Sequence, residues 1–172
     1  MIAGRGSVAA NAGHGSDIAQ GIKVVSVTLP SEELAQSLEA LLRQLSSQAP
    51  RATLDRLAEV VNCPSVTLFL AMDRGTAVGM LTLTMLPLLS GRRARIEDVV
   101  VAEAYRRRGI GALLVARAVS TAAETGARTV DLTARPDHPD AVRLYTRFGF
   151  KRRESDLYRL EPSALDPGSE SR

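Results

Sequence analysis

The stretch Val99-Val-Val-Ala-Glu-Ala-Tyr-Arg106-Arg-Arg-Gly109-Ile-Gly111-Ala-Leu-Leu114 is the most informative part of the 172-residue sequence. Its apolar start is typical of a buried strand, and its two glycines stand where a helical pattern begins. The first N–H groups of a helix have no partner within it, and the helix dipole favours anions there. Glycine lets a backbone approach a diphosphate closely, and arginines add positive charge beside it. The stretch therefore predicts a strand, a turn and a helix that together bind phosphate groups.

Two other phosphate-binding motifs do not fit these residues. No Gly-Lys-Ser/Thr follows the glycines, so the turn is not a Walker A loop. The dinucleotide fingerprint requires a third glycine, which is missing here, and the two glycines follow a basic run. A Gly-x-Gly pair by itself also occurs at helix starts where the glycines serve only packing or turning.

Hydrophobic periodicity around this stretch predicts a single α/β domain over residues 21–161. Strands are expected at 22–29, 65–72, 76–86, 93–101, 128–133, 150–153 and 156–160. Helices are expected at 31–45, 53–61 and 109–125, and from 139 to 148. The pattern predicts a central mixed, twisted sheet of about six to seven strands flanked by about four helices. Strands 93–101 and 128–133 should be parallel, with a right-handed crossover between them. Residues 1–20 and 162–172 are predicted to be flexible tails.

The amino-acid composition argues against nucleic-acid binding, metal binding and membrane contact. The net charge is only +3, and the arginines gather in short clusters, which favours local anionic groups over a nucleic acid. Aromatic residues make up 3% of the chain, too few for the stacking platforms that single-stranded nucleic acids need. Two histidines and one cysteine give no metal-ligand spacing, so no metal is expected. The lone cysteine, with no apolar membrane-length run and no signal-peptide pattern, predicts a cytoplasmic protein without membrane contact.

Two motifs resemble those of a known family. Arg106-x-x-Gly109-x-Gly111 after the valines looks like the acetyl-CoA motif of the GNAT superfamily of N-acetyltransferases. Ala141-x-x-Leu144-Tyr145-x-x-x-Gly149-Phe150 resembles the superfamily's Asn-x-x-Ala-x-x-Leu-Tyr-x-x-x-Gly-Phe. The resemblance covers residues 22–160, and the order of predicted elements also fits the family fold. One position departs from the pattern, because His138 stands where relatives have an asparagine that holds pantetheine.

The resemblance implies an acetyl-CoA-dependent N-acetyltransferase in which a neutral amine attacks the thioester directly. It places the pantetheine arm in a splay between strands 93–101 and 128–133, bonded by backbone groups of Val99 and Val101. The implied cofactor-binding residues are Val99, Val100, Val101, Arg106, Arg107, Arg108, Gly109, Ile110, Gly111, Ala112 and His138. His138 can donate or accept a hydrogen bond, but it can equally serve only to cap the helix.

The expected acceptor is a primary amine of a small molecule. A protein N-terminal or lysine amine is the alternative, and so is a non-catalytic acyl-CoA-binding module. In the superfamily, acceptor specificity lies in the first two helices and the loop before the last strand, here residues 31–62 and 151–157. The family also includes many homodimers.

The catalytic candidates are Tyr145 and Glu97. By resemblance, Tyr145 is the general acid that protonates the departing thiolate, although it also belongs to an apolar helical stripe. Glu97 is the candidate base, because alternation should place it on one face with Val99 and Val101. Asp98, on the other face, is the second candidate. Residues 96–99 resemble a strand of glucosamine-phosphate acetyltransferases, which supports Glu97, yet this residue can also be a structural carboxylate paired with Arg93 or Arg95.

Overall fold

A computed structural model describes residues 21–135 and 137–162 of the chain. The elements are β1 (Ile22–Ser26), α1 (Glu32–Leu45), α2 (Leu54–Asn62), β2 (Val66–Asp73), β3 (Thr76–Leu86), β4 (Arg93–Val101), the 3-10 turn η1 (Glu103–Tyr105), α3 (Ile110–Glu124), β5 (Val130–Leu132) and α4 (Pro139–Arg147). The predicted bounds of β4 agree with the structure, and those of the four helices agree to within one or two residues.

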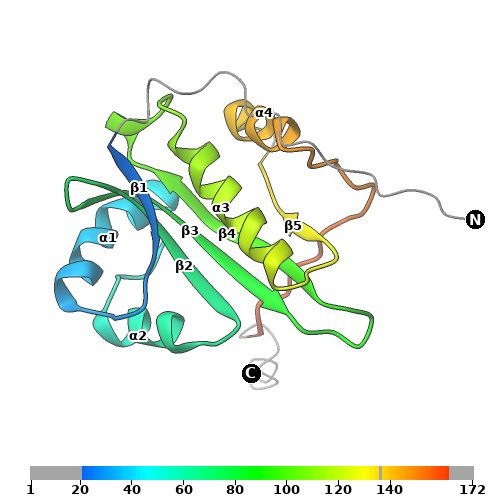
Figure 1. Cartoon of the computed structure of the whole chain (residues 1–172), viewed down its shortest axis with the longest axis horizontal. Coiled ribbons are helices and arrows are strands. Elements are labelled where there is room, and N and C mark those ends of the chain that lie inside the picture. The colour runs from blue at the N-terminus through cyan, green and yellow to red at the C-terminus, as the bar shows by residue number, and fades with distance from the viewer. Residues whose placement is uncertain (1–20, 136, 163–172) are drawn as a thin grey trace, which may run out of the picture.

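The strands form one mixed sheet in the order β1-β2-β3-β4-β5 (Figure 1). The first three neighbouring pairs are antiparallel, and β5 lies parallel to β4. The predicted α/β class, the mixed sheet, the four helices and the parallel pair are therefore confirmed.

The helices cover both faces of the sheet and divide the core into two clusters (Figure 1). On one face, α3 buries Ile110, Leu114 and Val115 against the sheet. On the other face, α1 and α2 bury Leu38, Leu41 and Leu57. We call these the α3 face and the α1/α2 face.

Local chemistry explains where the first two helices begin. The Ser31 hydroxyl accepts a hydrogen bond from the Leu34 N–H at 3.2 Å, and the Thr53 hydroxyl accepts one from the Arg56 N–H at 3.3 Å. Each cap satisfies an N–H that has no partner within its helix. None of the described helices combines the length and apolar character needed to cross a membrane.

The sheet has five strands in the described part of the chain, which is fewer than the six to seven expected. The predicted strands 150–153 and 156–160 are wrong, because no strand follows α4 as far as residue 162. Phe150 packs against the core of the α3 face, but Leu157 and Tyr158 are 66% and 88% exposed, so the segment beyond Phe150 is not packed on the sheet as a strand would be. The predicted tails, residues 1–20 and 162–172, lie outside the described residues except for Pro162.

Candidate active site

The site is built around the turn from Ala102 to Gly109, which joins β4 to α3 and is called the β4–α3 turn below. Gly109 is the N-cap residue of α3 and has a left-handed backbone with φ of +76°. Arg107 is also left-handed, at φ +65°. Positive φ values in a turn help to aim N–H groups into a concave surface that binds anions. The unpaired N–H groups of the first turn of α3 lie next to this bend.

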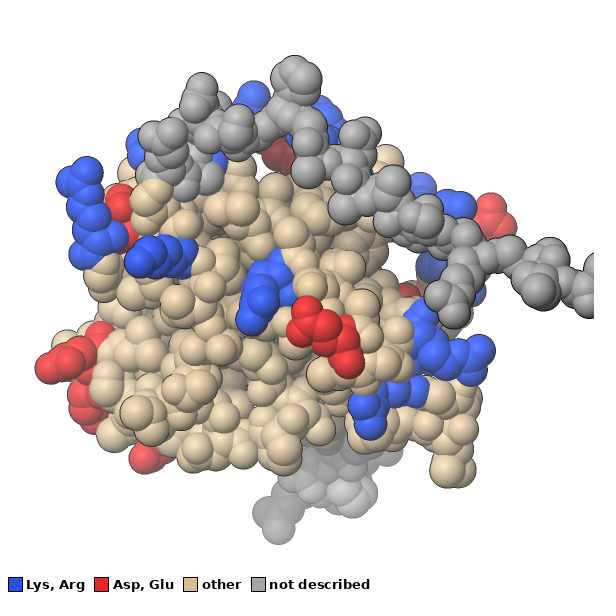
Figure 2. All heavy atoms as spheres, in the orientation of Figure 1, with Lys and Arg blue, Asp and Glu red and all other residues tan. Residues whose placement is uncertain are grey.

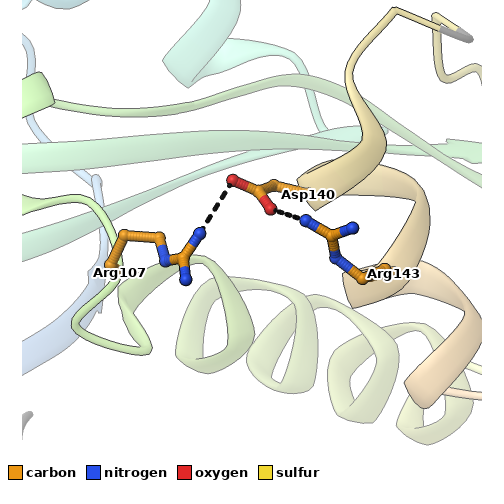
Figure 3. Close-up of polar contacts among 3 residues, drawn as sticks. All are labelled: Arg107, Asp140 and Arg143. Atoms are coloured by element: carbon orange, nitrogen blue, oxygen red, sulfur yellow. Dashed lines mark hydrogen bonds and ion pairs between the residues drawn. The ribbon is translucent and has the colours of Figure 1, made fainter.

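The three arginines of the turn are exposed, and each is held by a different contact. Arg106 Nε donates to the Val101 carbonyl oxygen at 3.2 Å. Arg107 Nη1 donates to Asp140 Oδ2 of α4 at 3.3 Å (Figure 3). The Arg108 guanidinium lies 4.9 Å from the centre of the Tyr105 ring. Three positive charges therefore surround the start of α3, where anionic groups are favoured.

Asp140 links the turn to α4, because it also accepts a hydrogen bond from Arg143 (Figure 3). The hydrogen bond from Arg143 is the main cause that lowers the pKa of Asp140, and the charge of Arg107 adds to it. All three side chains are mostly exposed. Figure 2 shows Lys and Arg side chains in separate groups on the face drawn, consistent with local clusters of charge.

Beside the turn, β4 and β5 separate. Their pairing runs from Ala94 with Val130 to Ile96 with Leu132, and the rest of β4 extends beyond β5. The Ala102 N–H bonds to the Val78 carbonyl of β3, so backbone groups at alternate positions, Val101 and Val99, point to the opposite side. The end of this pairing at Ile96 is compatible with the predicted splay, and backbone groups of Val99 and Val101 lie on the side away from β3.

The glycines at the start of α3 leave room for a ligand and for α4. A Cβ added at Gly109 would meet no atom within 4 Å, so the surface in front of this residue is open. A Cβ added at Gly111 would lie 3.3 Å from Leu144 Cδ2, so this glycine lets α4 approach α3. The open turn, its free N–H groups and its arginines together fit the diphosphate of coenzyme A.

The remaining cofactor candidates have different settings. Ile110 and Val100 are buried in the cores of the α3 face and the α1/α2 face, respectively, and Ala112 is half-buried. His138 is the N-cap residue of α4, and its carbonyl accepts bonds from Ala141 and Val142. Its side chain is 62% exposed and does not cap the helix.

Tyr145 lies on α4 with only 8% of its surface exposed. It packs in the core of the α3 face, and its ring makes an edge contact with Phe150 at 5.9 Å between centroids. Burial raises the pKa of its phenol. The structure thus agrees with the apolar-stripe interpretation of this residue, and the raised pKa keeps its hydroxyl protonated at neutral pH.

A bulge in β4 changes the predicted arrangement of the two carboxylates. Met80 pairs with Val100 and Thr82 with Glu97, so Leu81 alone lies opposite Asp98 and Val99. Ala94 and Ile96 precede the bulge and Val99 and Val101 follow it, yet all four pack on the α3 face. Glu97 therefore points to the α1/α2 face, and the prediction that it shares a face with Val99 and Val101 is wrong.

The two carboxylates have different partners. Glu97 forms an ion pair with Arg95, one of the two partners anticipated for it. Asp98, with a φ of +52°, accepts a hydrogen bond from the Thr82 hydroxyl at 3.2 Å. Its pKa is raised, chiefly by desolvation and further by the charge of Glu97, although the bond from Thr82 opposes this. The Asp98 side chain is open to solvent on one side, so its desolvation is partial.

Sequence reasoning missed several residues around the turn. Asp73, at the end of β2, accepts a hydrogen bond from the Tyr105 hydroxyl at 3.0 Å. Gln44 of α1 accepts one from the Glu103 N–H at 2.8 Å. Tyr105 and Glu103 both lie in the stretch 99–114. Nothing in the local sequence identifies their partners, which are 32 and 59 residues away, respectively.

Comparisons with known proteins agree with this geometry. Residues 33–150 match the acetyltransferase (GNAT) family. The chain is 36% identical over 98 residues to an N-alpha-acetyltransferase, MAK3, of Arabidopsis thaliana. That match covers 57% of this chain and 51% of the relative, so it spans about half the length of the relative.

Solved structures give the same fold. A protein described as a transcriptional regulator from Bacillus halodurans C-125 superposes with a TM-score of 0.69 at 28% identity, covering 81% of this chain and 99% of that one. An aminoglycoside N-acetyltransferase solved in complex with CoA also has a TM-score of 0.69, at 18% identity, covering 81% of this chain and 94% of that one. The chain belongs to the acetyltransferase (GNAT) family, a class of acetyl-CoA-dependent N-acetyltransferases.

Proposed function

We propose that this protein transfers the acetyl group of acetyl-CoA to a primary amine by direct attack of the amine. The observation that carries the proposal is the β4–α3 turn, where three arginines and the free N–H groups of α3 lie beside the open side of β4. This arrangement suits a ligand with a diphosphate at one end and an extended amide-containing arm at the other.

In this proposal the chain holds acetyl-CoA at two places. Arg106, Arg107, Arg108 and the N–H groups at Gly109, Ile110, Gly111 and Ala112 bind the diphosphate. The backbone groups of Val99 and Val101 bind the pantetheine arm as a neighbouring strand would. His138, at the start of α4, offers an exposed imidazole beside this arm. When bound, acetyl-CoA supplies an activated acetyl thioester, and a backbone N–H of β4 would polarise its carbonyl.

Tyr145 is proposed as the general acid. A phenol is protonated at neutral pH, so Tyr145 has a proton to donate, and burial holds its pKa above the ordinary value. A phenol and a thiol have ordinary pKa values of about 10 and about 8.5, so the transfer needs a site with little water. The low exposure of Tyr145 supports such a setting.

Of the two carboxylates, Asp98 is the better base. The Glu97 carboxylate is already engaged in the ion pair with Arg95. Asp98 has no such cationic partner among the contacts described above, and desolvation raises its pKa towards the working range of a general base. Glu97, the base favoured from sequence, then serves to raise the proton affinity of Asp98 through its charge.

The acceptor is proposed to be a small-molecule amine. Residues 151–157, one of the two regions in which the family resemblance places acceptor specificity, are all exposed and would be free to contact such an amine. A protein N-terminal amine is the second candidate, and the 36% identity with an N-alpha-acetyltransferase favours it.

Titration calorimetry with acetyl-CoA, followed by thiol release against amines, tests the proposal. The panel contains aminoglycosides, polyamines, amino acids, peptides with free N-termini and N-blocked lysine peptides. Absence of acetyl-CoA binding would overturn the proposal, and binding without turnover on any amine would indicate a non-catalytic acyl-CoA module.

The role of Tyr145 is tested by replacing it with phenylalanine. Tyr145→Phe should lower kcat by about 100-fold, because general acids contribute at least about that factor, while acetyl-CoA affinity stays near wild type. Tyr158→Phe is the matched control, since Tyr158 is 88% exposed and should tolerate the change. Unchanged turnover in Tyr145→Phe would remove this residue from the mechanism.

A further inference from the structure

We propose that Tyr105, held in place by Asp73, is a positioning residue for the diphosphate site of the β4–α3 turn. The inference rests on the proposed function, because it assumes that coenzyme A binds at this turn. Neither residue belongs to the acetyl-CoA motif that runs from Arg106 to Gly111. Their role would be to fix the arginine and backbone N–H groups before the ligand arrives.

The contact joins two regions that are far apart in sequence. Asp73 ends β2, immediately before the Arg74-Gly75 turn of the β2–β3 hairpin, and Tyr105 ends η1. The Tyr105 hydroxyl donates to Asp73 Oδ2 at 3.0 Å, and both residues are half-buried. The pKa of the Tyr105 phenol is raised, first by this hydrogen bond and then by the charge of Asp73, so the hydroxyl remains a donor throughout the neutral pH range.

The same tyrosine also contacts an arginine of the diphosphate site. The Arg108 guanidinium lies over the Tyr105 ring, 4.9 Å from its centre, which is within the range of a cation–π interaction. The hydroxyl of Tyr105 fixes the ring at its edge, and the face of the ring then supports Arg108. A long, exposed arginine would otherwise sample many rotamers, so this support lowers the entropy lost when a phosphate binds it.

The bonds that join the turn to β3 and α1 lie at its beginning, and the Arg107–Asp140 ion pair near its end joins two exposed side chains. Ala102 is bonded to β3 through the Val78 carbonyl at 2.9 Å, and Glu103 is bonded to α1 through Gln44 at 2.8 Å. Tyr105 is four residues from Gly109, closer to the start of α3 than either of these anchors. The Tyr105–Asp73 bond therefore restrains the part of the turn that carries the arginines.

Calorimetry with CoA provides the first test, using wild type, Tyr105→Phe, Asp73→Ala and the double variant. Phenylalanine keeps the ring under Arg108 and removes only the hydroxyl, and alanine removes the acceptor. Each single variant should bind CoA about three- to tenfold more weakly, the usual effect of one hydrogen bond. The double variant should bind no more weakly than the weaker single variant, because both changes break one contact. Tyr158→Phe and Asp156→Ala, both exposed, are the matched controls.

Kinetics separate positioning from a general loss of structure. With acetyl-CoA as donor, Tyr105→Phe should raise KM and leave kcat unchanged. With S-acetyl-pantetheine, a donor that lacks the diphosphate, KM should equal that of wild type. An equal rise in KM with both donors would overturn the inference, as would wild-type CoA affinity in both single variants. If wild type itself fails to bind CoA, the proposed function fails instead, so the two failures are distinguishable.

Discussion

The two sides of the candidate site are held to the fold in different ways. The β4–α3 turn is bonded to β2, β3 and α1 through Asp73, Val78 and Gln44. The opposite side consists of α4 and the exposed residues 151–162. Helix α4 packs on the α3 face through Leu144 and Tyr145, but its bond to the turn is an ion pair between two exposed side chains, Arg107 and Asp140. The difference indicates that the proposed diphosphate side is preformed, and that the side proposed to face the acceptor is less restrained.

This comparison has a functional consequence. Every member of the family must bind the same coenzyme, so a turn fixed by several distant elements is useful on that side. Acceptors differ, and an exposed segment such as 151–161 can change without affecting the core. Five substitutions and a pH profile test whether the two sides are as unequal as their contacts suggest.

The largest effect is expected at the bulge of β4, on the well-anchored side. Asp98→Asn should lower kcat/KM by about 100-fold or more, because it removes the proposed base and keeps an oxygen for the Thr82 hydroxyl. Glu97→Gln should have a much smaller effect, since Glu97 acts on Asp98 only through its charge. Steady-state kinetics measure both variants, and a larger loss in Glu97→Gln would reverse the assignment.

The pH profile of wild type is an independent test of Asp98 as the general base. Asp98 acts as a carboxylate, so kcat/KM should fall as the pH drops through its raised pKa. The acidic limb of the profile should therefore lie above the ordinary aspartate range. This limb should disappear in Asp98→Asn, and its persistence would assign it to another group.

An intermediate effect is expected at the ends of α3. Gly109→Ala and Gly126→Ala place a side chain at nearly equal positive φ, +76° and +78°, with no atom within 4 Å of the added Cβ. Both should lose stability, by roughly 1 kcal/mol or more. Only Gly109→Ala should also weaken CoA binding, by about tenfold, since it alters the diphosphate turn. Thermal melting and calorimetry measure the pair, and equal CoA affinities would argue against the turn as the binding site.

The smallest effect is expected on the exposed side. Asp140→Asn removes the bridge between Arg107 and Arg143, yet ion pairs between exposed side chains contribute little to stability. The melting temperature and the CoA affinity should stay close to wild type. A large loss of either would show that α4 and the turn act as one unit, and the contrast between the two sides would then be incorrect.

The sequence by itself determined most of the fold and the local structure of the proposed diphosphate side of the site. Helices with an apolar stripe and a capping residue, such as α1 after Ser31, carry their signals within a few residues. The motif from Arg106 to Gly111 is equally local, because a strand, a bend and a helix start follow one another in the chain. Short-range patterns of this kind can be interpreted without knowing what packs against them.

Only the tertiary structure decided the direction of Glu97, the partner of Tyr105 and the course of the C-terminal segment. The bulge at Asp98 depends on the register between β3 and β4, and one extra residue reverses the face of every side chain beyond it. The Tyr105–Asp73 bond joins residues 32 positions apart. The strands expected after α4 did not form, because strand formation depends on a neighbouring edge and on buried surface, neither of which a local pattern specifies.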